Sequence, residues 1–319
     1  MGYGNYSHEA HIAVTEARAG RSQSEVFTQG HCHPDMNPLG VKVRESRDSD
    51  AHPASVGIVF ALDVSGSMGE VPHGLATRTM PTFMEHVTAV LPDAQVLFMA
   101  VGNAYTDRSP LQVGQFECDA QAMDRWLARI HLEGAGGGLC ESYDLAMYFA
   151  ARHTALDCDE KRAKKAYFFM TGDEPPFARM DGPQITRLLG DTVTEVPDIY
   201  AIVEELRRRY AVFFLIPDRA RAAREGTAAV WTHLLHEACV TLDSPDDTAA
   251  VAALLVGITE GALRDEAAIR AHAAETMKLG EAHGARLARM LKGYAAAIAK
   301  GPLAAPTRMG ERSSEGFKD

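Results

Sequence analysis

Three oxygen-bearing side chains stand on alternate positions in the segment Asp63-Val64-Ser65-Gly66-Ser67. One carboxylate and two hydroxyls at this spacing can converge in a tightly turned loop, and Gly66 allows the backbone to bend there. Hard divalent cations prefer oxygen ligands, and Mg²⁺ takes one or two carboxylates while it keeps several waters. The segment is therefore a candidate metal site, although an ordinary turn in which an Asp or Ser caps a helix explains the same pattern.

Two further polar clusters follow along the chain. Glu141 and Ser142 come directly after the glycine-rich stretch 134–138, and Asp173 lies in Thr171-Gly172-Asp173-Glu174. Glycines let a backbone approach an ion closely, so that Glu141 or Ser142 can point at it; a flexible loop with a favourable charge in the first turn of a helix is the alternative. Three such clusters are hard to explain by turn chemistry alone.

The elements that must position these clusters are short apolar runs alternating with amphipathic segments. We predict strands at 56–62, 95–101, 166–170, 211–216 and 239–242, with edge strands at 111–116 and 41–43. We predict helices at 75–91, 120–130, 141–153, 199–210, 228–237 and 247–262. Continuous apolar strands alternating with helices predict an α/β, Rossmann-like fold, with a mostly parallel central sheet and helices on both faces. Ligands of such sheets bind beyond the carboxyl ends of the strands, where these clusters stand.

Composition and charge limit the classes of function. The 319 residues are 46% apolar and carry a formal net charge of −11, with no basic patch, so we expect no nucleic-acid partner. No apolar stretch reaches the roughly 18 residues of a membrane span, and the first residues lack the pattern of a secretory signal. The five cysteines form no C-x-x-C pair and are typical of reduced thiols in a reducing compartment. Together these features predict a cytoplasmic location without membrane association.

Three regions differ in texture. Residues 1–54 are polar without a sustained period and are interpreted as an extended N-terminal extension. Residues 55–262 contain the alternating strands and helices and form the predicted domain. Residues 263–319 begin with an Ala-rich helical stretch to about residue 300 and end in a Pro/Gly/Ser-containing tail, which we expect to be disordered.

The middle region resembles the von Willebrand factor A (integrin I-like) family, which gives residues 55–262 their interpretation as a domain of that fold. Asp63-Val64-Ser65-Gly66-Ser67, after an apolar strand and before Met68-Gly69, matches the D-x-S-x-S signature of the family's metal-ion-dependent adhesion site. The family's third metal loop maps onto Asp173. Many members place a threonine in the second loop; this chain has none there and resembles the subgroup with a following glutamate, which makes Glu141 the matching ligand and Ser142 the alternative. The ligand set implied by the resemblance is Asp63, Ser65, Ser67, Glu141 and Asp173.

The resemblance implies a protein-binding function. Members of this type hold Mg²⁺, with Mn²⁺ or Ca²⁺ as alternative ions, and an open coordination position accepts an Asp or Glu of a protein partner. We therefore expect an adaptor or assembly factor, working with a MoxR-like AAA+ ATPase or within a bacterial stress or anti-phage system. Two alternatives stay open: a metal-dependent hydrolase using Asp63, Glu141 and Asp173, which would lack an evident general base, and a structural subunit of a larger assembly.

Overall fold

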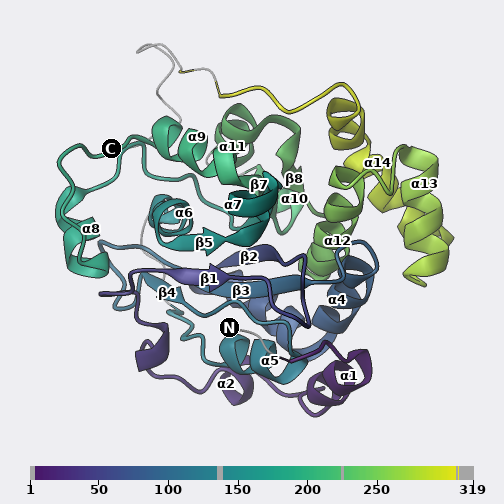
Figure 1. Cartoon of the computed structure of the whole chain (residues 1–319), viewed down its shortest axis with the longest axis horizontal. Helices are drawn as coiled ribbons and strands as arrows, with labels where there is room; N and C mark the ends of the chain where they lie inside the picture. The colour runs from purple at the N-terminus through teal and green to yellow at the C-terminus, as the bar shows by residue number, and fades with distance from the viewer. Residues whose placement is uncertain (1–3, 135–138, 224–225, 307, 309–319) are drawn as a thin grey trace.

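The computed structural model describes residues 4–134, 139–223, 226–306 and 308. Within these residues, six strands form the central sheet in the order β4-β3-β2-β6-β7-β8 (Figure 1). All neighbouring strands are parallel except β3 and β4, which are antiparallel. The strands are β2 (Val56–Asp63), β3 (Ala94–Val101), β4 (Leu111–Val113), β6 (Ala166–Thr171), β7 (Tyr210–Ile216) and β8 (Cys239–Thr241). The predicted α/β fold class, with a mostly parallel Rossmann-like sheet, is confirmed.

The central strands are apolar throughout because both faces of the sheet are covered. Every residue of β2, β3 and β6 is buried, as expected for strands that helices flank on two sides. Four phenylalanines stand in register across β3, β2, β6 and β7, namely Phe98, Phe60, Phe169 and Phe213. Their neighbouring rings stack with centroids 4.9 to 6.1 Å apart. This aromatic row ties the four strands together through the middle of the core.

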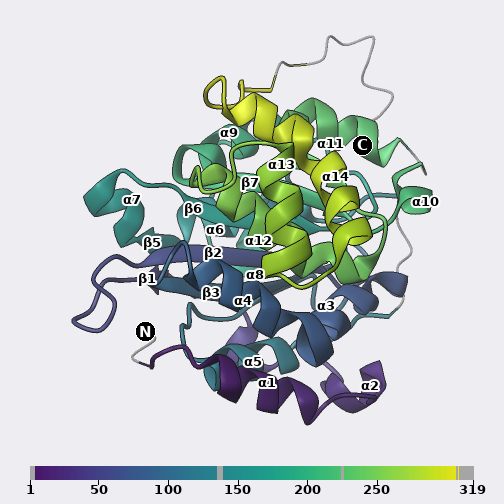
Figure 2. The same cartoon turned by 90° about the vertical axis from the view of Figure 1, so that its right-hand side faces the viewer.

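Helices cover both faces of the sheet. On one face α6 (Tyr143–Arg152) packs against α9 (Ile199–Arg209), and on the other α4 (Met80–Thr88) packs against α12 (Thr248–Thr259). In Figure 2 the α4 and α12 helices lie in front of the sheet. These four helices, together with α5 (Ala120–Ala128) and α11 (Thr227–Leu235), match the predicted helical segments. The other α-helices between β2 and β8 in the described part of the chain are α3 (Glu70–Gly74), α7 (Asp157–Arg162), α8 (Gly182–Leu189) and α10 (Arg219–Ala222).

The N-terminal region differs from the extended lead-in that its sequence predicts. It contains α1 (His8–Glu16), which Ser7 caps, and α2 (Gln23–Val26). The α1 helix packs against α4 and α5, so contacts with the domain stabilise a segment whose sequence has little helical periodicity. The edge strand predicted at 41–43 lies three residues later as β1 (Arg44–Ser46), which pairs in parallel with β5 (Thr154–Leu156) outside the central sheet.

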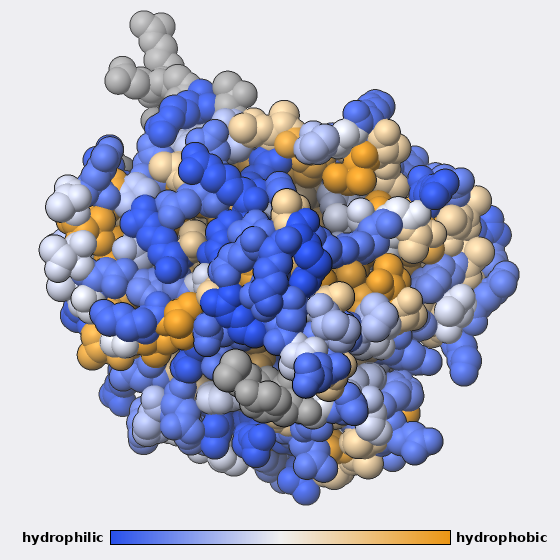
Figure 3. Space-filling view, viewed as in Figure 1, coloured by the Kyte–Doolittle hydropathy of each residue, from blue (hydrophilic) through white to orange (hydrophobic). Residues whose placement is uncertain are grey.

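The C-terminal region forms α13 (Glu266–Ala271) and α14 (Glu281–Ile298), as the Ala-rich sequence predicts. These helices pack against each other, and α14 packs against α12 (Figures 1 and 2). The tail from residue 309 onward lies outside the described residues. None of the described helices is long and apolar enough to cross a membrane. Most of the face shown in Figure 3 is hydrophilic, with small hydrophobic patches between polar side chains.

Candidate metal centre

The candidate site lies at the carboxyl edge of the sheet, where the direction of the chain connections changes. From β2 the chain passes to β3 on one side and later returns as β6 on the other side. Asp63 is the last residue of β2, and Asp173 follows the end of β6 at Thr171. Loops that leave neighbouring strands in opposite directions open a crevice between them, which is the usual ligand position in such sheets. Topology therefore brings the first and third polar clusters together.

The first loop is held by hydrogen bonds to the carboxylate of Asp63. Its Oδ1 accepts from the backbone N–H of Ser65 at 2.8 Å and from the Ser65 hydroxyl at 2.6 Å. Its Oδ2 accepts from the Tyr143 hydroxyl at 2.6 Å. Gly66 follows with a φ of +40°, a conformation that glycine adopts at little cost. Ser67 lies in the short helical turn Gly66–Gly69, and its side chain lies outside the described part of the structure.

The third loop brings two carboxylates to Asp63. One oxygen from each of Asp63, Asp173 and Glu174 lies within 4.8 Å of the others. The helix α11 fixes this loop, because Thr227 donates to the Asp173 carbonyl at 2.9 Å and Trp231 Nε1 donates to the Glu174 carbonyl at 3.0 Å. The three carboxylates are therefore placed by fixed backbone, as a preformed site requires.

Gly172 allows the close packing beneath this loop. A Cβ atom at this position would lie 1.9 Å from the Tyr143 hydroxyl oxygen, so a larger residue would displace the tyrosine that binds Asp63. The Tyr143 ring makes edge contacts with Phe214 and Trp231, whose own rings stack with centroids 3.8 Å apart. These packed aromatic rings thus support the loop that carries the acidic residues.

The second loop places Glu141 beside this group but outside the three carboxylates that meet within 4.8 Å. Glu141 is 1% exposed as a whole residue, and its backbone N–H donates to the Pro175 carbonyl of the third loop at 3.2 Å. The hydroxyl of Ser142 accepts a hydrogen bond from the Ala104 N–H at 3.0 Å. Of the two residues that the sequence left as alternatives, Glu141 therefore keeps the freer oxygen, whereas Ser142 braces the loop after β3. The glycine-rich stretch at 135–138 lies outside the described residues.

Burial and mutual repulsion make the carboxyl groups hard to ionise together. Burial, and secondarily the charge of Asp173, raises the pKa of Asp63 to about 7 against the hydrogen bonds that lower it. Burial and the charges of Asp63, Asp107 and Asp173 raise the pKa of Glu141 to about 9. Burial, a hydrogen bond to Asp173 and the neighbouring charges raise the pKa of Glu174 to about 10. A bound cation would favour the ionised forms of all these groups.

Several buried oxygens of the cluster have no hydrogen-bond partner among the described residues. They are Asp173 Oδ1, Glu174 Oε2 and Glu141 Oε2, together with Thr171 Oγ1. Arg221 approaches the cluster, with Nη1 3.6 Å from Asp173 Oδ2, and offsets part of the negative charge. Buried unpartnered oxygens are costly unless an ion or a water binds them. Carboxylate and hydroxyl oxygens are the ligands of Mg²⁺, Mn²⁺ and Ca²⁺, so the residues present fit a hard divalent cation.

The sequence predicts Asp173 as a metal ligand and assigns no role to its neighbour Glu174, which lies in the same group of carboxylates. The signal for Glu174 was present, because two consecutive acids followed a buried strand. Tyr143 and Arg221 carried no such signal, since the contacts of Tyr143 with Asp63 and of Arg221 with Asp173 join residues far apart in sequence. Asp107 belongs to the turn after β3, where its Oδ2 accepts a hydrogen bond from the Asn103 N–H at 2.7 Å.

Comparisons with known proteins give structural similarity alone. No family model matches the chain, and no curated protein matches it. The pilus adhesin SpaC from Lactobacillus rhamnosus GG, in its open conformation, aligns with 65% of this chain at 14% identity and a TM-score of 0.40. The mussel byssus proximal thread matrix protein 1 aligns with 64% of the chain at 10% identity and a TM-score of 0.40. The chain spans 30% of the adhesin chain and 47% of the matrix protein chain.

Proposed function

We propose that this protein is a Mg²⁺-dependent protein-binding adaptor or assembly factor whose metal ion takes an Asp or Glu of its partner. The observation that carries the proposal is the meeting of Asp63, Asp173 and Glu174 within 4.8 Å at the carboxyl edge of the sheet. The raised pKa values of Asp63 and Glu174, and the unpartnered oxygens of Asp173 and Glu174, support the presence of a cation in the working protein. The resemblance of the Asp63–Ser67 segment to a metal-ion-dependent adhesion site supports the same proposal.

The surface around the cluster supports contact with a protein rather than with a small molecule. Among the described residues, four large apolar side chains are strongly exposed, and two of them, Tyr105 and Leu139, flank this site. Tyr105 follows Ala104, which binds Ser142, and Leu139 stands two residues before Glu141. The Tyr105 ring meets the Phe177 ring at a centroid distance of 5.0 Å, three residues beyond Glu174. Exposed aromatic and aliphatic groups beside a polar anchor are typical of protein interfaces.

The ion supplies an electrophilic position for an external carboxylate, while the chain supplies its placement. Ser65 and Tyr143 hold Asp63 in one orientation, and α11 fixes the backbone of Asp173 and Glu174. A MoxR-like AAA+ ATPase is the first partner to test, because the family resemblance points to it. Nothing in this proposal requires the chain to transform a substrate.

The test is affinity purification of the tagged chain from its native cell in Mg²⁺ and in EDTA. We expect one or more proteins to be retained in Mg²⁺, lost in EDTA, and lost with the Asp63→Ala variant. Asp50→Ala removes an exposed acid before β2 and is the matched control, which should retain the partner. A retained partner should lose binding when a single exposed Asp or Glu of its own is changed to Ala.

Other results of the same experiment point to the other functions. Partner retention that is equal in Mg²⁺ and EDTA, and equal in Asp63→Ala, contradicts the adaptor and indicates a structural subunit. Turnover of a retained ligand that EDTA stops would indicate the hydrolase.

A further inference from the structure

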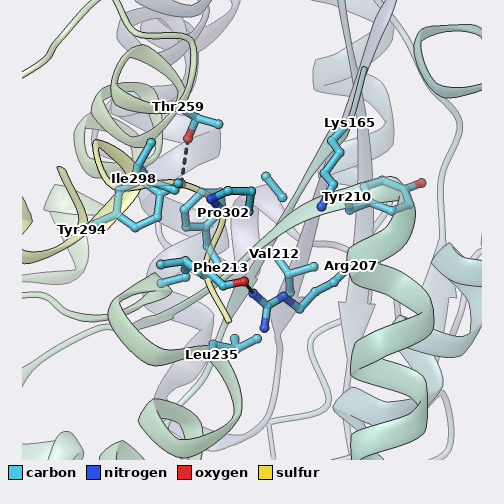
Figure 4. A pocket seen from close by; sticks show the side chains of 14 residues that line it. Lys165, Arg207, Tyr210, Val212, Phe213, Leu235, Thr259, Tyr294, Ile298 and Pro302 are labelled. Carbon is cyan, nitrogen blue, oxygen red and sulfur yellow. Dashed lines mark hydrogen bonds between the residues drawn. The ribbon is translucent and has the colours of Figure 1, made fainter. Parts of the chain in front are cut away.

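A second candidate site lies at the opposite end of the sheet. A pocket of about 350 Å³ opens between the first half of β7, the end of α9, the helix α14 and the segment at residues 301–303 (Figure 4). The neighbouring strand β8 pairs only with Phe214–Ile216, so the edge of β7 from Tyr210 to Phe213 has no strand beside it among the described residues. The shortness of β8 therefore leaves a gap, which helices and the C-terminal segment surround. A cavity of this volume is within the range of small-molecule sites.

The walls of the pocket are mainly apolar. Val212 and Phe213 contribute from β7, Leu235 from the end of α11, and Tyr294, Ile298 and Pro302 from α14 and the segment after it (Figure 4). The Phe213 and Tyr294 rings meet edge to face with centroids 5.3 Å apart. The Tyr294 hydroxyl is already hydrogen-bonded to Thr259 at 2.8 Å, so that side of the pocket presents a satisfied and largely hydrophobic surface. An apolar body of a ligand would fit against it.

Among the described residues, two cations and no acidic residue line this pocket. Lys165 and Arg207 are its charged lining residues. Arg207 donates through Nη1 to the Ala304 carbonyl at 2.7 Å and through Nη2 to the Leu303 carbonyl at 2.8 Å. A guanidinium has five N–H donors, so three remain beyond these two bonds. Burial lowers the pKa of Arg207, and burial together with the charge of Arg207 lowers the pKa of Lys165. The exposed Glu204 raises the pKa of Arg207 and Asp159 raises the pKa of Lys165, and each offsets only part of the lowering.

Concentrated positive charge in an apolar pocket is unexpected on a chain with a formal net charge of −11. We propose that the pocket binds an amphipathic organic anion, a medium-length carboxylate whose head contacts Arg207 and Lys165 and whose apolar body lies against Phe213 and Tyr294. The anion supplies the counter-charge that the lining lacks, and bidentate pairing of a carboxylate with Arg is geometrically favourable. Because Arg207 also holds the carbonyls of Leu303 and Ala304, an occupied pocket fixes the C-terminal segment against α9.

The test uses decanoate as the probe, with 1-decanol and decyltrimethylammonium as matched controls, all below the concentrations at which they form micelles. Isothermal titration of the full chain should show saturable binding of one decanoate, with weaker binding of decanol and none of the cationic probe. Arg207→Gln should weaken decanoate binding about tenfold or more, because a charged hydrogen-bonding group is lost. Lys165→Gln should weaken it by a smaller factor.

Arg208→Gln is the matched control, since it removes the same charge from the exposed neighbour of Arg207. It should bind decanoate like the parent. Equal binding of decanoate and decanol, or unchanged binding in both Arg207→Gln and Lys165→Gln, would overturn the proposal. Unchanged far-UV circular dichroism and melting of each variant show that it is folded. If Arg207→Gln does not fold, the Lys165→Gln variant and the probe comparison decide the result.

Discussion

The two ends of the central sheet carry opposite chemistry. At the carboxyl edge, acidic side chains crowd together on the loops after β2 and β6, and several of their buried oxygens have no partner among the described residues. At the amino end, the described lining of the pocket beside β7 has two cations and no acid. Each end therefore concentrates charge of one sign, and each is interpreted as the site of a ligand of the other sign.

The difference between the two ends lies in how each is built. The carboxyl edge is made from short segments that leave neighbouring parallel strands, so their polar residues meet wherever the strands do. The amino end is made from side chains that range from Lys165 to Leu303, with no shared motif. The first kind of site can be found from local sequence, and the second kind only from the fold.

The largest expected effect comes from filling the space beneath the acidic loop. Gly172→Ala places a Cβ atom 1.9 Å from the Tyr143 hydroxyl oxygen and forces that side chain away from Asp63. We expect a loss of about 3 kcal/mol or more in the free energy of unfolding, measured by urea denaturation, because overpacking and a broken buried hydrogen bond act together.

The matched control for Gly172→Ala is Gly293→Ala in α14, where the nearest atom to the new Cβ lies 3.9 Å away. There we expect a gain of up to about 1 kcal/mol, because alanine favours a helix interior. Similar losses in both variants would show that Gly172 has no special packing constraint.

The stability of the folded protein depends on pH, and this dependence must be known before ligand binding at either end of the sheet is measured. Burial, and secondarily the charge of His8, lowers the pKa of His11 in α1 to about 4 from its usual 6.5. The folded protein thus holds this imidazole neutral. The stability that the neutral imidazole contributes is fully present above pH 6.5 and is lost as the pH falls towards 4. We expect His11→Gln to reduce the difference in the free energy of unfolding between pH 7 and pH 4 by up to about 3 kcal/mol, measured by denaturation at both pH values. An unchanged pH profile would contradict the assignment.

The next effect separates the two ends directly. Asp173→Asn should weaken Mg²⁺ binding about tenfold or more and leave decanoate binding unchanged, because only the carboxyl edge loses a charge. The metal-free variant should also melt higher than the metal-free parent at pH 8, since the charge of Asp173 opposes ionisation of Asp63, Glu141 and Glu174. Asp50→Asn should change neither quantity, and a variant with parental Mg²⁺ affinity would remove Asp173 from the site.

The smallest expected effect tests the wall of the pocket. Tyr294→Phe removes the 2.8 Å hydrogen bond to Thr259, whose hydroxyl keeps its bond to the Leu255 carbonyl at 2.7 Å. We expect a loss of about 1 kcal/mol in the free energy of unfolding, measured with urea. Decanoate binding should stay near the parental value, because the ring remains. A large loss of binding would show that the hydroxyl contacts the ligand.

Most of the fold follows from the sequence because the apolar runs are long and continuous. The runs at 56–62, 95–101 and 166–170 lie in β2, β3 and β6 within a residue of their predicted ends. The α1 helix could not be predicted, because its polar sequence becomes helical through packing on α4 and α5. The strand at 44–46 was placed three residues early, because its partner β5 is distant in sequence.

Part of the candidate site can also be predicted from the sequence. Asp63 ends the apolar strand β2 and Asp173 stands two residues beyond the end of β6, so the pattern predicts both their place and their edge of the sheet. Glu174 stands beside Asp173 and was overlooked, and Tyr143 meets Asp63 only through the packing of α6. Whether Glu141 is a ligand depends on side-chain geometry at an ion, which no sequence pattern specifies.

The most direct test of the central claim is isothermal titration of Mg²⁺ into the metal-stripped chain, with Asp63→Ala, Ser65→Ala and the control Asp50→Ala alongside. We expect saturable binding of one Mg²⁺ to the parent and to Asp50→Ala, with no measurable binding to Asp63→Ala and weakened binding to Ser65→Ala, in variants that melt cooperatively. Absence of binding by the parent, or equal affinity in the parent and Asp63→Ala, would contradict it.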